Sequence, residues 1–82
     1  MRFSIIVVSL GVPRKIRELI RDLERAGFIF ERGKGSHRTF RHPVTRDVVI
    51  VSGQLGGDAR PYQENDVRRV LANPANRKEK NR

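Results

Sequence analysis

The sequence predicts a small α+β domain, a three-stranded antiparallel sheet with two helices on one face, in the order helix–strand–strand–strand–helix. Three observations predict it: an amphipathic helical repeat follows Pro13, strand-like segments separated by turns fill residues 28–51, and a second helical repeat ends at Ala72. Two amphipathic helices covering one face of a sheet form a stable two-layer core. The chain of 82 residues is long enough for one such core. We divide it into an N-terminal strand or arm at 1–12, a domain at 13–72 and a disordered basic tail at 73–82.

The first twelve residues are apolar and β-branched, with Arg2 ahead of the run. They resemble the first half of a signal peptide, but no small-residue cleavage site follows and the run is too short to span a bilayer. A charged helical segment follows directly. We therefore expect a strand or a loosely held arm, a cytoplasmic protein and no membrane partner.

The first helix is predicted to begin at Pro13, because proline is tolerated in the first turn. Its apolar face follows helical spacing and is continued by Ala26; it comprises Ile16, Leu19, Ile20 and Leu23. Gly27 is placed to end the helix in a left-handed cap. The opposite side carries a stripe of arginines three or four residues apart, Arg14, Arg17, Arg21 and Arg25. This stripe indicates either a surface for an anionic partner or an ordinary solvated face.

Three strands are predicted next, at residues 28–32, 37–41 and 48–51, with a turn at 33–36. In the second strand, alternation places Phe40 on the core side with Arg38, and His37, Thr39 and Arg41 on the opposite side. The third strand is apolar on both sides, so we expect it to be central or well covered. A glycine-rich loop at 52–62 and a helix at 63–72 complete the domain.

Composition limits the chemistry. The chain has no cysteine, which excludes disulfides, thiolate nucleophiles and cysteine-based zinc sites, and its two histidines are poor material for a metal site. We expect no metal and no small-molecule cofactor. The net charge of +9 favours nucleic acid, an anionic membrane or an acidic protein as partner. A solvated basic surface remains the alternative.

The candidate site is the segment around the turn at 33–36, where two glycines precede a histidine flanked by cations. Imidazole changes charge near neutral pH, so His37 could act as general base or acid in metal-free RNA cleavage. Cations nearby would stabilise the developing phosphate charge. We predict His37 as the catalytic residue. The predicted RNA-binding residues are Arg32, Lys34, Gly35, Ser36, Arg38, Arg41, His42 and Arg46.

Two other functions fit the same pattern. A non-catalytic RNA-binding module would use the basic face and tolerate loss of His37. A protein-interaction module would bind an acidic partner through the arginine stripe of the first helix and have no nuclease activity.

Two motifs make the sequence resemble the HicA (YcfA-like) toxins of bacterial toxin–antitoxin pairs. The motifs are Lys15-Ile16-x-Glu18-Leu19-Ile20-x-x-Leu23-x-x-x-Gly27-Phe28 and Gly35-Ser36-His37-Arg38-x-Phe40-Arg41-His42-Pro43. The resemblance implies a fold similar to double-stranded RNA-binding domains, cleavage of mRNA with His37 as the catalytic histidine, and inhibition by a HicB-type antitoxin. The chain departs from the family in two places. Many members start near Lys15, and many carry Pro-x-His where this chain has Ser52-Gly53-Gln54.

Overall fold

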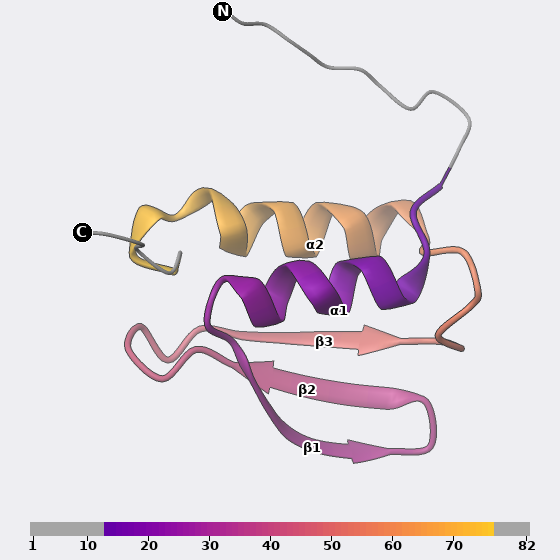
Figure 1. The fold of residues 1–82 in the computed structure, drawn as a ribbon, viewed down its shortest axis with the longest axis horizontal. Helices are drawn as coiled ribbons and strands as arrows, with labels where there is room; N and C mark the ends of the chain where they lie inside the picture. The colour runs from indigo at the N-terminus through magenta and orange to yellow at the C-terminus, as the bar shows by residue number, and fades with distance from the viewer. Residues whose placement is uncertain (1–12, 77–82) are drawn as a thin grey trace, which may run out of the picture.

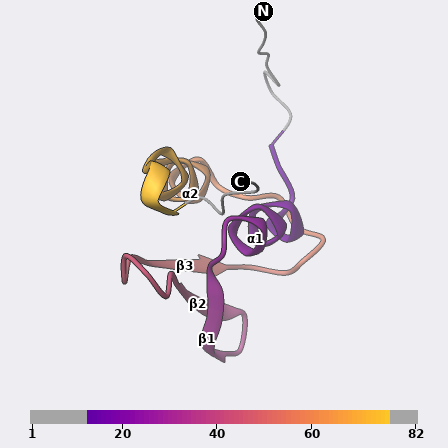
Figure 2. The ribbon, with the colours of Figure 1, turned by 60° about the vertical axis from the view of Figure 1, so that its left-hand side comes forward.

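The computed structural model describes residues 13–76, which form one α+β domain (Figure 1). The elements follow one another as α1 (Ile16–Arg25), β1 (Ile29–Lys34), β2 (His37–Arg41), β3 (Val48–Ser52), α2 (Pro61–Ala72) and a 3₁₀ turn η1 (Pro74–Asn76). The strands form one antiparallel sheet in the order β1-β2-β3. Both helices cover the same face of this sheet (Figure 2). The predicted fold class is confirmed, while the likeness to double-stranded RNA-binding domains stays a prediction. The arm predicted at residues 1–12 lies outside the described residues.

Helix α1 begins at Ile16, three residues later than predicted. The preceding residues are extended because they pair with the loop ahead of α2: Lys15 bridges to Asp58, and the Ala59 amide donates to the Arg14 carbonyl at 2.7 Å. The end of the helix is as predicted. Gly27 has a φ of 104°, and the Phe28 amide donates to the Leu23 carbonyl at 3.0 Å, which is the Schellman arrangement.

The core lies between the two helices and the sheet. Leu19 and Leu23 of α1 and Val67 of α2 pack against Phe40 and Val51, and each of these side chains is at most 3% exposed. The apolar repeat of the first helix therefore identified its buried face correctly. Phe40 belongs to the core, so the helices lie on its side of the sheet, and within residues 13–76 no helix covers the other face, which we call the open face (Figure 2).

Within residues 13–76, β3 is an edge strand covered on one face, so the prediction that it is central or well covered is wrong for this part of the chain. Val49 and Val51 are buried, whereas Val48 and Ile50 are 42% and 52% exposed. The physical reason is that β2 occupies the centre of the sheet, and helices cover only one face of β3. The four apolar residues of β3 are therefore buried at alternate positions only.

The hairpin of β1 and β2 is tighter than predicted. Lys34 pairs with His37, so the turn consists of Gly35 and Ser36 alone. Gly35 has a φ of 61°, the first central residue of a type II′ turn, where glycine is favoured. The register shifts between Phe30 and Arg32, which makes Glu31 a β-bulge. This bulge interrupts the period-2 alternation of side chains between the two faces along β1.

The prediction of a disordered tail at 73–82 is wrong for residues 74–76, and residues 77–82 lie outside the described residues. Residues 74–76 form η1, and Asn76 is fully buried. Its amide nitrogen donates to the Asp47 carboxylate and to the Val70 carbonyl, both at 2.8 Å, and its amide oxygen accepts from the Thr45 hydroxyl. This polar anchor ties the β2–β3 turn to the end of α2. A search for apolar anchors in the sequence could not find it.

Candidate active site

His37 is the first residue of β2 and lies exposed on the open face of the sheet, as the alternation predicts. Its cross-strand partners are Lys34 on β1 and Ser52 on β3, which share its face. Side chains directly opposite in antiparallel strands have Cβ atoms about 5 Å apart. The central strand therefore places the imidazole between an ammonium group and a hydroxyl group.

Ser52 holds the imidazole through a hydrogen bond that sequence reasoning missed. The Oγ of Ser52 and the Nδ1 of His37 are 2.8 Å apart. This bond fixes the plane of the ring and leaves Nε2 as the nitrogen that, within residues 13–76, has no hydrogen-bond partner. The signal for Ser52 was present in the departure from the family motif, since Ser52 stands where many members have the proline of Pro-x-His. Only the register of β2 and β3 makes it visible.

The turn before His37 is held by Arg38 from the helix-covered side of the sheet. Arg38 Nη1 donates to the carbonyl oxygens of Ser36, at 3.1 Å, and Gly53, at 2.9 Å. These bonds link the turn to the end of β3. Arg38 is half-buried, and its Nη1 positions the turn by bonding to the protein's own backbone; its RNA-binding role stays a prediction.

Among the other predicted cations, Arg32 lies diagonally across from His37 on the open face, about 7–8 Å away by strand geometry. Arg41 shares this face but lies four residues along β2, about 13 Å from His37. It forms a bidentate ion pair with Glu31 of the bulge, at 2.8 and 3.3 Å. The hydrogen bond between them raises the pKa of Arg41 and lowers the pKa of Glu31. Arg46 is exposed in the β2–β3 turn at the far end of the sheet.

His42 belongs to the core, and its predicted RNA-binding role is corrected. It is 5% exposed and packs edge-on against Phe28, with ring centroids 5.0 Å apart. Its Nε2 lies 3.2 Å from the Ala26 carbonyl oxygen, and its Nδ1 accepts from the Val44 amide at 3.2 Å. Because a carbonyl oxygen only accepts, Nε2 must carry the proton. Both ring nitrogens are thus used by the backbone.

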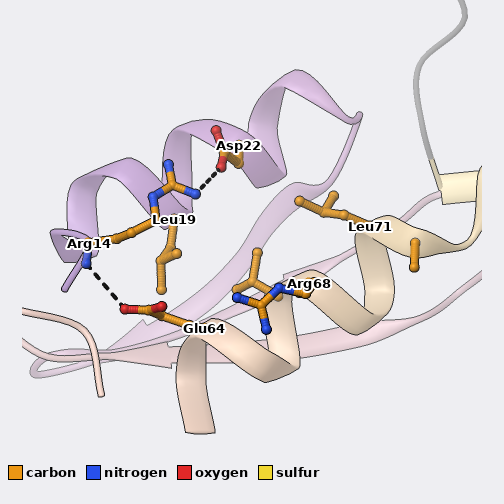
Figure 3. A pocket seen from close by; sticks show the side chains of 8 residues that line it. Arg14, Leu19, Asp22, Glu64, Arg68 and Leu71 are labelled. Atoms are coloured by element: carbon orange, nitrogen blue, oxygen red, sulfur yellow. Dashed lines mark hydrogen bonds and ion pairs between the residues drawn. The ribbon is translucent and has the colours of Figure 1, made fainter. Parts of the chain in front are cut away.

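The arginine stripe predicted on the first helix loses its first member, because Arg14 is engaged in contacts within the protein. Arg14 precedes α1 and pairs with Asp22 at 2.7 Å and with Glu18 at 3.6 Å. The hydrogen bond to Asp22 raises the pKa of the Arg14 guanidinium. Its backbone amide also donates to Glu64 of α2 at 3.2 Å. Figure 3 shows this pair of contacts at one end of a groove of about 290 Å³ between α1 and α2. Arg14 therefore joins the two helices.

Two further features concern metals and membranes. No cluster of three or more His, Cys, Asp or Glu side chains that could hold a metal ion occurs within residues 13–76. In the same part of the chain, no helix has the length and apolar character needed to cross a membrane.

A family model described as the HicA toxin of bacterial toxin–antitoxin systems matches residues 16–72, from the first residue of α1 to the last of α2. Comparisons with curated proteins and with solved structures gave no significant match. The matched segment contains the whole sheet, both helices, and His37 with its partners Lys34 and Ser52. A match of this extent shows that the chain belongs to the HicA toxin family.

Proposed function

We propose that this chain is the toxin of a type II toxin–antitoxin pair, a metal-independent endoribonuclease that cleaves mRNA with His37 as general acid and base and so inhibits translation. One observation carries the proposal: His37 is exposed on the open face of the sheet, with Nδ1 bonded to Ser52 and Lys34 directly opposite. Family membership supports the toxin role. Cytoplasmic mRNA is the substrate such an activity requires.

The chemistry follows from the free Nε2 of His37. This nitrogen takes the proton of a ribose 2′-OH, and O2′ attacks the adjacent phosphorus. The P–O5′ bond then breaks, and the 5′-oxygen receives a proton from the imidazolium or from water. The products are a 2′,3′-cyclic phosphate and a free 5′-hydroxyl. Ser52 acts through His37 by keeping the ring oriented during both proton transfers.

Charge stabilisation comes from the cations nearest to His37. Lys34 and Arg32 share its face and are placed to balance the negative charge that develops on the phosphate oxygens. The space beside Gly35 is open, because a Cβ built there would meet no atom within 4 Å, and without a side chain at Gly35 the backbone of the Gly35–Ser36 turn can approach the RNA closely. Arg41 would contact a more distant phosphate once released from Glu31.

His37 is the one histidine on the open face, so the second proton transfer falls to the same imidazole or to water. The sequence has two histidines, and the second, His42, is buried. The second family histidine is replaced here by the Ser52-Gly53-Gln54 segment. A single-histidine site predicts slow turnover, which suits a toxin that only needs to damage its target.

The test is His37→Ala, with His37→Gln as the isosteric variant and Thr39→Ala as a matched control on the same strand and face. We expect both His37 variants to remain folded, to lose growth arrest on expression and to lose cleavage of a purified mRNA. Thr39→Ala should keep both activities. Full toxicity of a folded His37→Ala protein would overturn the catalytic assignment and favour a non-catalytic RNA-binding module.

The partner that follows from family membership is an antitoxin, and we propose that it is of the HicB type. It would inhibit by covering His37 and offering carboxylates to the neighbouring cations. Binding of the antitoxin and of RNA should then be mutually exclusive. Simultaneous binding of both to the His37→Ala protein would contradict this shared surface.

A further inference from the structure

The two edges of the sheet differ in how they are protected from pairing with other strands. β1 carries a bulge at Glu31 and the charged residues Arg32 and Lys34, which are features that discourage strand addition. β3 has the sequence Val48-Val49-Ile50-Val51-Ser52, with no charge, proline or bulge. Within residues 13–76, no strand pairs with its outer side. An edge of this kind is normally covered by another polypeptide segment.

The register identifies which backbone groups of β3 point outward. The Gly53 amide donates to Ser36 and the His42 amide donates to Asp47, so these two pairs bound the β2–β3 ladder. Hydrogen-bonded pairs alternate along an antiparallel ladder, so Val49 and Val51 bond to β2, and the N–H and C=O groups of Val48 and Ile50 face away. The Ser52 carbonyl supports this assignment, because it faces outward and accepts from the Gln63 side chain at 2.7 Å.

A groove of about 290 Å³ runs along this edge, between β3 and one side of α2. Its helix wall consists of Tyr62, Asp66 and Arg69, which follow one another at helical spacing, and its strand wall includes the exposed Val48 and Ile50. A groove between an edge strand and a helix is the geometry that binds an extended peptide by strand addition.

We propose that an extended segment of the antitoxin pairs with β3 as a fourth strand and lies in this groove. The proposal rests on the proposed function for the identity of the partner, which is the antitoxin that keeps the nuclease inactive. The outward N–H and C=O groups of Val48 and Ile50 select a polypeptide backbone as the occupant. RNA fits less well, because Arg69 of the groove is already paired with Asp66 at 3.2 Å.

The position of the groove explains why an inhibitor would use it. β3 ends at Ser52, whose hydroxyl holds the imidazole of His37. A strand added at β3 therefore extends the sheet next to the catalytic side chain, and flanking residues of the partner can reach the open face. The net charge of +9 and the exposed Lys34 and Arg32 on that face attract an acidic partner.

The experiment uses the full chain carrying His37→Ala, so that expression is not toxic, and a HicB-type antitoxin chosen because its co-expression abolishes the toxicity of the parent chain. Ile50→Pro removes the outward N–H without removing a bond to β2, and Ile50→Thr is the matched control that keeps the N–H and the β-branched shape. We expect Ile50→Thr to bind like the parent. Ile50→Pro should bind about 30-fold more weakly or worse, because a strand acceptor is left unpaired.

Hydrogen exchange of the Val48 and Ile50 amides tests the same point without a substitution. We expect both amides to exchange quickly in the free toxin and to become protected when the antitoxin binds. Tight antitoxin binding that leaves them unprotected, or that is equal for folded Ile50→Pro, overturns the proposal. Protection by a short RNA instead would assign the groove to RNA. Protection in the free toxin that disappears on removing residues 1–12, or on dilution, would assign it to this chain's own segment or to a second copy.

These outcomes are separate from those that test the proposed function. Binding and exchange are measured on a protein without the catalytic histidine, so they do not depend on nuclease activity. Loss of cleavage is measured on the parent toxin with RNA alone. A parent that fails to cleave RNA but forms the β3-paired complex would leave this docking surface intact and remove the nuclease proposal.

Discussion

His37 and His42 show how two residues of the same type can have opposite roles five positions apart. His37 lies on the open face and bonds to the Ser52 side chain, whereas His42 is buried and bonds to the backbone at Ala26 and Val44. The difference arises because side chains alternate along a strand and the two residues are an odd number of positions apart, so His42 lies on the helix-covered side with Phe40, against Phe28 and the end of α1.

We predict that Ser52→Ala lowers kcat by about tenfold to a hundredfold, with a smaller effect than His37→Ala, because the ring loses its orientation but keeps its chemistry. KM should change little, since Ser52 does not hold the substrate. Ser52→Thr, which keeps the hydroxyl, should restore most of kcat. The measurement is single-turnover cleavage of a short RNA by the three proteins. Equal rates for Ser52→Ala and the parent would show that the hydrogen bond has no role in the reaction.

We predict that His42→Ala destabilises the fold by about 2–4 kcal/mol, because it leaves the Ala26 carbonyl and the Val44 amide unpaired and opens a cavity beside Phe28. Urea unfolding followed by circular dichroism measures the change. His37→Ala is the comparison and should cost no more than about 0.5 kcal/mol, since its side chain is exposed. Similar losses for the two variants would contradict the burial of His42.

At the scale of elements, the hairpin of β1 and β2 controls which cations are available. The bulge at Glu31 brings its carboxylate to Arg41, and this pair neutralises one of the two arginines on the open face of the hairpin, leaving Arg32. The Gly35–Ser36 turn is held from the other side by Arg38. The hairpin thus uses two cations, Arg38 and Arg41, for its own structure and exposes Arg32 and Lys34 beside His37.

We predict that Glu31→Gln strengthens RNA binding, because Arg41 becomes free to contact phosphate. One added phosphate contact should steepen the slope of log K against log salt by about 0.7 for a single strand. The pKa of Glu31 is lowered by Arg41, so the ion pair is intact above the ordinary carboxylate range. It is lost as the pH falls through the lowered pKa, and acid should then imitate the variant. Binding of a non-cleavable RNA to His37→Ala protein, measured with and without Glu31→Gln, checks both points.

At the scale of the whole molecule, the two faces of the sheet have different tasks. Both helices lie on one face (Figure 2) and enclose the core with it, and the other face carries His37 and its neighbouring cations. The excess of positive charge means that association with a polyanion should be driven largely by counterion release. The open face with His37 and the groove along β3 adjoin at Ser52, which bonds to His37 and lines the groove.

We predict that RNA affinity falls steeply with salt. Engagement of three or four phosphates by the cations of the open face would give a slope of about −2 to −3 in log K against log salt. The measurement is titration of a short non-cleavable single-stranded RNA with His37→Ala protein from low to moderate salt. Paired substitution of Lys34 and Arg32 by Gln should reduce the slope. A flat response would place the RNA elsewhere.

Local patterns in the sequence were sufficient for the type of each α-helix and strand and for the faces of α1 and β2. The helical repeat of Ile16, Leu19 and Leu23 identified the buried face of α1, and strand alternation placed Phe40 inside and His37 outside. Gly27 marked the end of α1 because a left-handed cap requires glycine locally. These features depend on residues close together in the chain, so sequence spacing reports them directly.

The tertiary structure alone decided which groups find a partner. Lys15 is extended because it pairs with Asp58, Ser52 meets His37 because of the β2–β3 register, and Asn76 is buried by contacts with the β2–β3 turn and α2. Each contact joins residues far apart in sequence, and the periodicity of one segment carries no information about the segment beside it. For the same reason, the apolar pattern of β3 could not show that, within residues 13–76, one of its edges has no partner strand, which depends on the position of β2 at the centre of the sheet.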